Sequence, residues 1–243
     1  MNYMKHVAII GAGIAGLRAG LELIKDPSVT VNIFEKSPSV GGRVATRRFD
    51  NSFVNHGCPA FWGEQATNLP KAMRDKLLKS PKAKLHTKTR VARVGLTGEI
   101  KLDNGEHQQF DHVLITAPLP QARELLLENI LPEIVYSKSI LFIGEVEGQG
   151  VRLEMGPTWC EEHFEKSDEE LRALGEKSLK RSLHGLDVKK WRYAQVLFGV
   201  KRSYFEFGPC INIAGDAFDP RGQYRFKAAW FSGLASVEKI LCH

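Results

Sequence analysis

The chain has 243 residues, of which 43% are hydrophobic and 26% are charged, so it can form a substantial core and is expected to be a soluble globular protein. It contains no apolar stretch of about eighteen residues, the length that a membrane span requires, so no membrane partner is expected. Its net charge of +6 is spread without a long basic block, which argues against nucleic-acid binding but favours an anionic ligand.

Cysteine usage and the start of the chain bear on location. The four cysteines are scattered and form no C-x-x-C pair, so neither a disulfide framework nor a metal site is expected. This usage fits a reducing compartment. The apolar run near the N-terminus is short and passes directly into a glycine turn, which predicts a first strand rather than a signal peptide. We therefore expect a cytoplasmic protein.

The beginning of the chain predicts the opening of a parallel sheet. Residues 6–10 form a buried apolar run, and residues 14–24 carry apolar side chains at helical spacing. Residues 29–34 alternate and are rich in β-branched types, which predicts a second strand. The order strand, helix, strand is typical of an α/β fold.

The rest of the chain continues to alternate between strand and helix patterns. A capping box formed by Ser167 and Glu170 marks the start of one helix. In chain order we expect a helix at 64–79, a hairpin of 85–94 with 99–102, a strand at 111–117, a helix reaching about 127, a strand at 139–146, a helix at 167–183, strands at 193–200 and 210–214, and a helix at 223–241.

The first motif is a glycine-rich turn, residues 11–16 (GAGIAG), between the first predicted strand and helix. Gly11 permits a tight turn, Gly13 lets the backbone approach a pyrophosphate, and Gly16 lets the helix pack closely on the strand. The helix N-terminus would present unpaired N–H groups to the phosphates. Glu35 ends the next strand 19 residues after Gly16, close to the spacing of about 20 expected for a ribose-binding carboxylate. Such a carboxylate disfavours a 2′-phosphate, so FAD or NAD fits and NADP does not; the alternative is a glycine turn with a solvated Glu.

The second motif, Gly41-Gly42-Arg43, stands just after the second predicted strand. The glycine pair lets the chain fold back over a dinucleotide, and Arg43 can pair with phosphate oxygens. The alternative is a flexible loop with surface arginines. The position directly after Glu35 favours the binding interpretation.

The third motif lies near the C-terminus, where residues 213–217 read IAGDA. A short apolar strand that ends in Gly215-Asp216 suits a carboxylate that binds a ribityl hydroxyl. The helix that follows, from about residue 223, could point its N-terminus at the flavin pyrimidine ring, where negative charge develops on reduction. The alternative is an ordinary turn at the end of a strand.

Together the three motifs resemble the FAD-binding superfamily of flavin-containing amine oxidases and renalases, and the finer similarity is to bacterial renalase-like proteins. Relatives usually carry Asp where this chain has Asn55, and the region between Pro118 and Trp191 is short of several strands, which implies a shortened substrate domain. The segments that carry the finer similarity are residues 41–48 (GGRVATRR), His56-Gly57 with Phe61 behind them, 111–121 (DHVLITAPLPQ), 191–195 (WRYAQ), 215–218 (GDAF) and 229–235 (AWFSGLA).

The resemblance implies an α/β fold in which a Rossmann-type FAD-binding domain with a mostly parallel sheet carries a small inserted antiparallel substrate or cap region. The FAD-binding domain would comprise residues 1–60, 81–128 and 191–243, with a helical cap segment at 61–80 and a reduced substrate or cap region at 129–190. FAD would be held non-covalently, with its adenine against the backbone of Val91. The residues expected to contact FAD are Gly11, Ala12, Gly13, Ile14, Ala15, Gly16, Glu35, Lys36, Gly42, Arg43, Gly57, Cys58, Val91, Gly215 and Asp216.

The resemblance further implies an FAD-dependent oxidoreductase of the oxidase type. A hydride would pass from a small donor, such as a dihydronicotinamide isomer, to the flavin, and molecular oxygen would be the acceptor. The sequence names no catalytic residue; His56 could touch flavin or substrate, but a lone His is more often a packing residue. A flavin amine oxidase or desaturase of the same fold and a catalytically silent FAD-binding or interaction module remain alternatives.

Overall fold

The computed structural model describes residues 3–50, 52–57, 68–127, 131–179, 184–224 and 226–242. The chain divides into two compact units. Unit 1 comprises residues 1–42, 69–135 and 196–243, and unit 2 comprises residues 43–68 and 136–195. The expected division into FAD-binding and cap segments stays a prediction. Within the described ranges, no helix is both long and apolar enough to cross a membrane.

Unit 1 is built on a six-stranded sheet in the order β13-β14-β9-β1-β2-β5. All neighbouring strands are parallel except β13 and β14, which are antiparallel. Residues 7–10 of β1 and 113–115 of β9 are apolar and buried, as expected in a parallel sheet that is covered on both faces. The strands are β1 (Lys5–Ile10), β2 (Val29–Phe34), β5 (Ala83–His86), β9 (His112–Ile115), β13 (Phe205–Glu206) and β14 (Ile211–Ile213).

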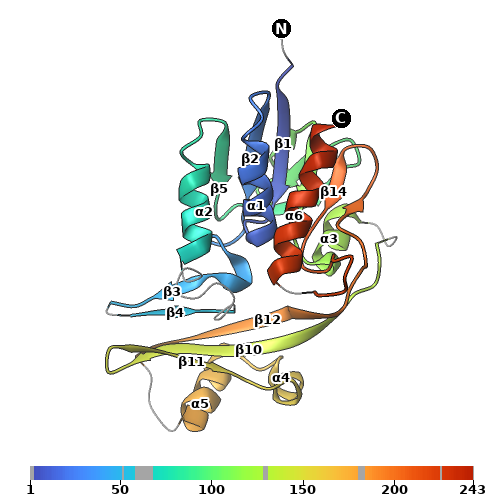
Figure 1. Ribbon diagram of the computed structural model, residues 1–243. Helices are drawn as coiled ribbons and strands as arrows, with labels where there is room; N and C mark the ends of the chain where they lie inside the picture. Colours follow the sequence, from blue (N-terminus) through green and yellow to red (C-terminus); the bar gives the residue numbers. More distant parts are fainter. Residues whose placement is uncertain are drawn as a thin grey trace. The chain divides into compact units, whose positions relative to one another are not determined.

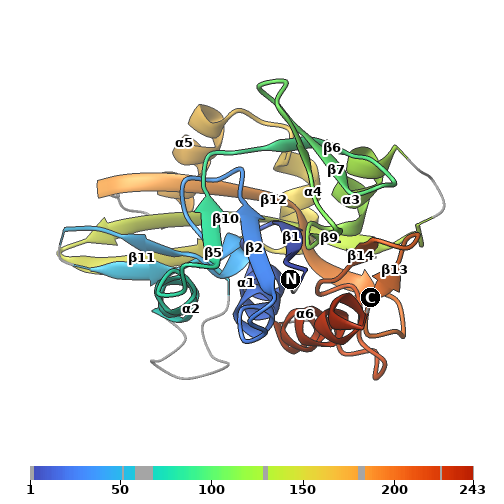
Figure 2. The ribbon, with the colours of Figure 1, turned by 90° about the horizontal axis from the view of Figure 1, so that it is seen from above.

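Two layers cover this sheet (Figures 1 and 2). Helices α1 (Ile14–Leu23), α2 (Leu69–Leu77) and α6 (Phe226–Leu241) lie on one face. A small antiparallel sheet in the order β6-β7-β8 lies on the other face, together with α3 (Leu119–Leu126). Its strands are β6 (Val91–Val94), β7 (Glu99–Leu102) and β8 (His107–Gln109).

Unit 2 is a second, smaller sheet with a different layer on each face (Figure 1). Three strands pair in the order β11-β10-β12, and β10 and β11 are antiparallel. Helices α4 and α5 lie against one face, and the hairpin of β3 and β4 lies against the other. The elements are the 3-10 turn Gly42–Val44 that leads into the unit, β3 (Thr46–Arg48), β4 (Phe53–Asn55), β10 (Val135–Val146), β11 (Gln149–Glu154), α4 (Pro157–His163), α5 (Asp168–Leu179) and β12 (His184–Phe198).

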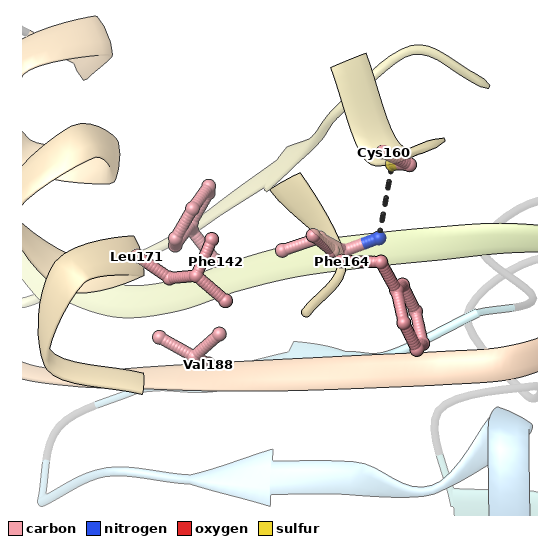
Figure 3. Close-up of a cluster of buried hydrophobic side chains, with 6 residues drawn as sticks. Phe142, Cys160, Phe164, Leu171 and Val188 are labelled. Atoms are coloured by element: carbon pink, nitrogen blue, oxygen red, sulfur yellow. Dashed lines mark hydrogen bonds between the residues drawn. The ribbon is translucent and has the colours of Figure 1, made fainter. Parts of the chain in front are cut away.

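Alternation along β10 explains the two cores of unit 2, because successive side chains of a strand point to opposite faces. Ile140 and Phe142 pack under the helices with Leu171 and Val188. Figure 3 shows Phe142, Leu171 and Val188 in this cluster. The buried Cys160 thiol accepts the Ile140 N–H at 3.3 Å in the same layer. On the opposite face, the side chains of Leu141 and Ile143 pack with Val54 of the hairpin. Both faces of the sheet are therefore partly buried.

Most predicted elements form, but several differ in extent. The capping box is confirmed, because the hydroxyl and amide of Ser167 bond the Glu170 carboxylate. The prediction of one strand over 85–94 is wrong: β5 joins the parallel sheet, and a turn through Lys88, with φ of 54°, precedes β6. The last helix begins at Phe226 rather than 223, and α2 begins at Leu69. The sequence analysis did not predict strand β11, helix α4 or the β3–β4 hairpin.

Candidate dinucleotide-binding site

Strand register brings the predicted binding motifs of unit 1 to one edge of the parallel sheet. Ile10 at the end of β1 lies opposite Phe34 of β2 and Ile115 of β9. Ile115 in turn lies opposite Ile213 of β14. The residues that follow these four strands therefore emerge side by side. After β1 the chain continues to β2, which pairs on one side of β1, whereas β9 pairs on its other side. Ligands of α/β proteins bind at such a switch point, at the carboxyl ends of the strands.

Gly11 and Gly16 are glycine because the fold leaves no room for a side chain. Gly11 has φ of 108°, and a Cβ there would lie 2.7 Å from the hydroxyl oxygen of Thr116. A Cβ on Gly16 would lie 2.1 Å from the carbonyl oxygen of Gly11. The Thr116 Oγ1 lies 3.0 Å from the carbonyl oxygens of both Ile10 and Gly11. Thr116 thus anchors the turn through its hydroxyl, a role that the sequence interpretation missed although the residue lies within the strand predicted at 111–117.

Gly13 differs from these two glycines, because packing does not require it. It is the N-cap of α1, and a Cβ built on it meets nothing within 4 Å. Among the described residues no side chain caps the helix at this position, and the first turn of α1 contains no acidic residue, so its N–H groups and the positive end of the helix dipole can face an anion. A bare backbone beside an uncapped helix N-terminus is the arrangement that a pyrophosphate needs. The described residues therefore fit a dinucleotide.

Glu35 is held at the glycine turn by two backbone amides. Its side chain is buried, with the residue 8% exposed, and its two carboxylate oxygens accept the N–H groups of Ala12 and Ser37, each at 2.8 Å. The Glu35 carbonyl accepts the N–H of Thr89, two residues before Val91. Val91 is buried as the first residue of β6, whereas Lys36 is exposed. The ribose and adenine contacts assigned to these residues stay predictions.

The glycine pair after β2 returns the chain to the glycine turn. Gly41, with φ of 105°, donates its N–H to the carbonyl of Ala12 at 2.8 Å. Gly42, with φ of 55°, would bring a Cβ to 3.9 Å from the Cα of Gly13. Both glycines adopt a left-handed conformation that side chains disfavour. The segment that precedes unit 2 is therefore tied to the loop that is expected to bind phosphate.

Arg43, Gly57 and Cys58 belong to unit 2. The Arg43 guanidinium donates to the carbonyls of Tyr193 and Ala194, each at 3.0 Å, so it anchors β12 as well as being the predicted phosphate partner. Gly57 has a packing reason, because a Cβ there would lie 2.3 Å from the Arg43 carbonyl oxygen. Cys58 lies outside the described residues. FAD contacts at these three positions stay predictions.

The loop after β14 presents a second bare stretch of backbone. A Cβ on Gly215 would meet nothing within 4 Å, and its N–H donates to the hydroxyl of Ser232 at 3.0 Å. Asp216 follows Gly215 directly at this edge of the sheet. Three residues on, the carboxylate of Asp219 is buried and bonded to Arg221, which lowers the pKa of Asp219. The Asp219–Arg221 ion pair thus stabilises the loop that is expected to bind the ribityl chain.

Replacing Glu35 by Ala should weaken FAD binding by roughly 1–3 kcal/mol, the value of a hydrogen bond to a charged group. The loss has two sources: the predicted ribose contact disappears, and the amides of Ala12 and Ser37 lose their acceptor. Glu35→Gln keeps the shape but directs an amide N–H₂ at one of those two donors, so it should also weaken binding. Titration of apoprotein with FAD, followed by flavin fluorescence, measures both constants. Wild-type affinity in both variants would contradict the placement of the adenosine.

Two family models match overlapping parts of the chain. The NAD(P)-binding Rossmann-like domain matches residues 9–75, and the flavin containing amine oxidoreductase family matches residues 66–141. A coproporphyrinogen III oxidase from Staphylococcus aureus is 40% identical over 62 residues, which are 25% of this chain and only 13% of that protein. The match to the NAD(P)-binding Rossmann-like domain contains the glycine turn, Glu35 and the Gly41-Gly42 pair.

Solved structures share the fold over nearly the whole chain. A proposed protoporphyrinogen oxidase from Exiguobacterium sp. 255-15 has a TM-score of 0.70 at 14% identity, over 97% of this chain and 98% of that one. An oxidoreductase from Methanosarcina mazei has a TM-score of 0.68 at 11% identity, over 96% of this chain and 100% of that one. The solved structures thus show a shared fold, one part of the chain is similar to the NAD(P)-binding Rossmann-like domain, and another part is similar to the flavin containing amine oxidoreductase family.

Proposed function

We propose that the chain oxidises a small hydride donor of the dihydronicotinamide type and uses molecular oxygen as the acceptor. The observation that carries the proposal is the sheet edge of unit 1, where bare backbone at Gly215 and Gly13 and the buried Glu35 carboxylate follow strands β14, β1 and β2. When bound, FAD would supply the redox chemistry, a two-electron transfer from the hydride donor to oxygen, which with two protons gives hydrogen peroxide.

The protein's own part in this reaction is binding and orientation. The N-terminus of α1 and the backbone at Gly13 would hold the pyrophosphate, Glu35 the ribose, and Gly215-Asp216 the ribityl chain. These groups lie at the ends of strands in fixed register, so they can set the flavin's position without large rearrangement. A hydride transfer needs no general base, which agrees with a proposal that names no catalytic side chain.

The choice of donor rests on the renalase-like segments at both ends of the chain and on charge. A dihydronicotinamide is a flat ring that can stack on a flavin without a deep pocket, and its dinucleotide forms carry phosphates. The net charge of +6 favours such anions, and Arg47 and Arg48 lie four and five residues after Arg43 of the Gly41-Gly42-Arg43 motif. A simple amine lacks this electrostatic attraction.

Oxidation of a carboxylated porphyrinogen is a second candidate function. The matched segment of the Staphylococcus aureus coproporphyrinogen III oxidase and the fold shared with the Exiguobacterium protein favour it. Such a macrocycle is also anionic, so the net charge does not separate it from a dinucleotide. Amine oxidation by the same fold is a further alternative, since one family model is that of the flavin containing amine oxidoreductases, and desaturation is another.

The purified protein should be yellow and should release FAD on heating or acid treatment, because the proposed contacts are non-covalent. Anaerobic stopped-flow mixing with dihydronicotinamide isomers should bleach the visible flavin absorbance, and admission of oxygen should restore it with formation of hydrogen peroxide. Amines and coproporphyrinogen III, mixed in the same way, serve as the competing donors. Faster bleaching by one of them would replace the proposed donor. No bleaching by any donor in a yellow protein would mark a catalytically silent relative.

A further inference from the structure

Helix α6 presents three small buried residues, Ser232, Gly233 and Ser236, to the elements that carry the candidate site. Ser232 is 1% exposed and Ser236 is fully buried. A Cβ on Gly233 would lie 2.3 Å from the carbonyl oxygen of Ala15, in the first turn of α1. Because only glycine permits this approach, α6 is packed directly against the helix start that is expected to face the pyrophosphate.

The same helix holds the loop after β14. The Ser232 hydroxyl accepts the N–H of Gly215 at 3.0 Å, although the two residues are 17 positions apart. One turn further along, the backbone carbonyl of Ser236 accepts the side-chain amide of Asn212, which lies within β14, at 3.3 Å. Neighbouring residues of α6 thus contact the first turn of α1, directly after Gly13, and the loop that contains Gly215, about 200 positions further along the chain.

We infer that Ser232 is a positioning residue for FAD: its hydroxyl fixes the orientation of the Gly215 peptide, while Gly233 fixes the distance between α6 and the glycine turn. The inference rests on the proposed placement of FAD at Gly13 and Gly215. A partly buried N–H that loses its acceptor is disfavoured, so the peptide would rotate or draw in water once the hydroxyl is removed. Gly215 and the carboxylate of Asp216 would then move away from the sheet edge at which FAD is proposed to bind.

Ser232→Ala tests this role, and Ser236→Ala is the matched control. Both serines are buried on the same helix, and each substitution removes one hydroxyl. Among the described residues, however, the Ser236 hydroxyl donates only to Gly233 of its own helix, and its backbone bond to Asn212 survives the substitution. We expect the FAD Kd of the reconstituted apoprotein to rise about tenfold in Ser232→Ala and less than about twofold in Ser236→Ala, as for loss of a single buried hydrogen bond.

Two further readouts separate positioning from simple destabilisation. The visible spectrum of bound flavin should change in Ser232→Ala but not in Ser236→Ala, because only the first alters the loop beside the ribityl chain. Urea unfolding of each apoprotein reports the loss of stability by itself. An FAD Kd within twofold of wild type in Ser232→Ala, or an equal rise in both variants, would overturn the inference. Failure of the wild-type protein to bind FAD would instead overturn the proposed function.

Discussion

Gly13→Ala apoprotein should unfold at nearly the same urea concentration as wild type, yet bind FAD about 10- to 100-fold more weakly, the loss expected for one hydrogen bond to a charged group. The fold should tolerate the methyl group because a Cβ there meets nothing within 4 Å, and the backbone, with φ of −75° and ψ of −174°, suits any residue. Binding should suffer because the methyl group stands where a phosphate must approach the backbone. A valine at the same position should enlarge the effect.

Gly16→Ala is the matched control, and it should behave in the opposite way. Its Cβ would lie 2.1 Å from the backbone carbonyl oxygen of Gly11, which cannot move without displacing the turn. We expect a loss of roughly 3 kcal/mol or more in the free energy of unfolding. Urea unfolding of the two apoproteins gives their unfolding free energies, and FAD titration of each variant gives its dissociation constant. If Gly13→Ala binds FAD as tightly as wild type, the pyrophosphate does not lie against this backbone.

Lowering the pH from 7 to 4 should cost the folded protein about 3 kcal/mol through His56 alone. Burial, with the nearby Lys189 cation, lowers the pKa of His56 in the folded state to about 4. The residue is 9% exposed, and among the described residues nothing bonds its buried Nε2. The unfolded chain binds a proton near pH 6.5, so between these values it holds more protons than the folded chain. Stability therefore falls as the pH drops from about 6.5 toward 4.

His56→Gln removes this titration while keeping a polar side chain next to Trp191. Urea unfolding at pH 7 and at pH 4 gives the unfolding free energy of each protein. Between these two pH values the wild type should lose about 3 kcal/mol more than the variant. Loss of other acid-sensitive interactions affects both proteins and cancels in the difference. The same pH slope in both proteins would show that His56 titrates normally in the folded state.

The binding edge of unit 1 could largely be predicted from the sequence because its signals are local. Glycines at 11, 13 and 16 directly follow a strand pattern, and Glu35 ends the next strand at the expected spacing. Parallel pairing of β1, β2, β9 and β14 then places the residues that follow these strands along one edge. The helix boundaries and the split between β5 and β6 were less predictable, because they depend on which distant strand each segment pairs with.

The sequence by itself determined the fold class, the dinucleotide motif and the positions from which its parts come. Tertiary structure alone decided why each glycine is there: Gly11 and Gly16 face Thr116 and the turn itself, whereas Gly13 faces open space. It alone also showed that Ser232 holds Gly215. The physical reason is that motifs reflect short-range spacing and backbone freedom. The room around a Cβ and the partner of a buried N–H are set by residues that meet only after the sheet and helices have packed.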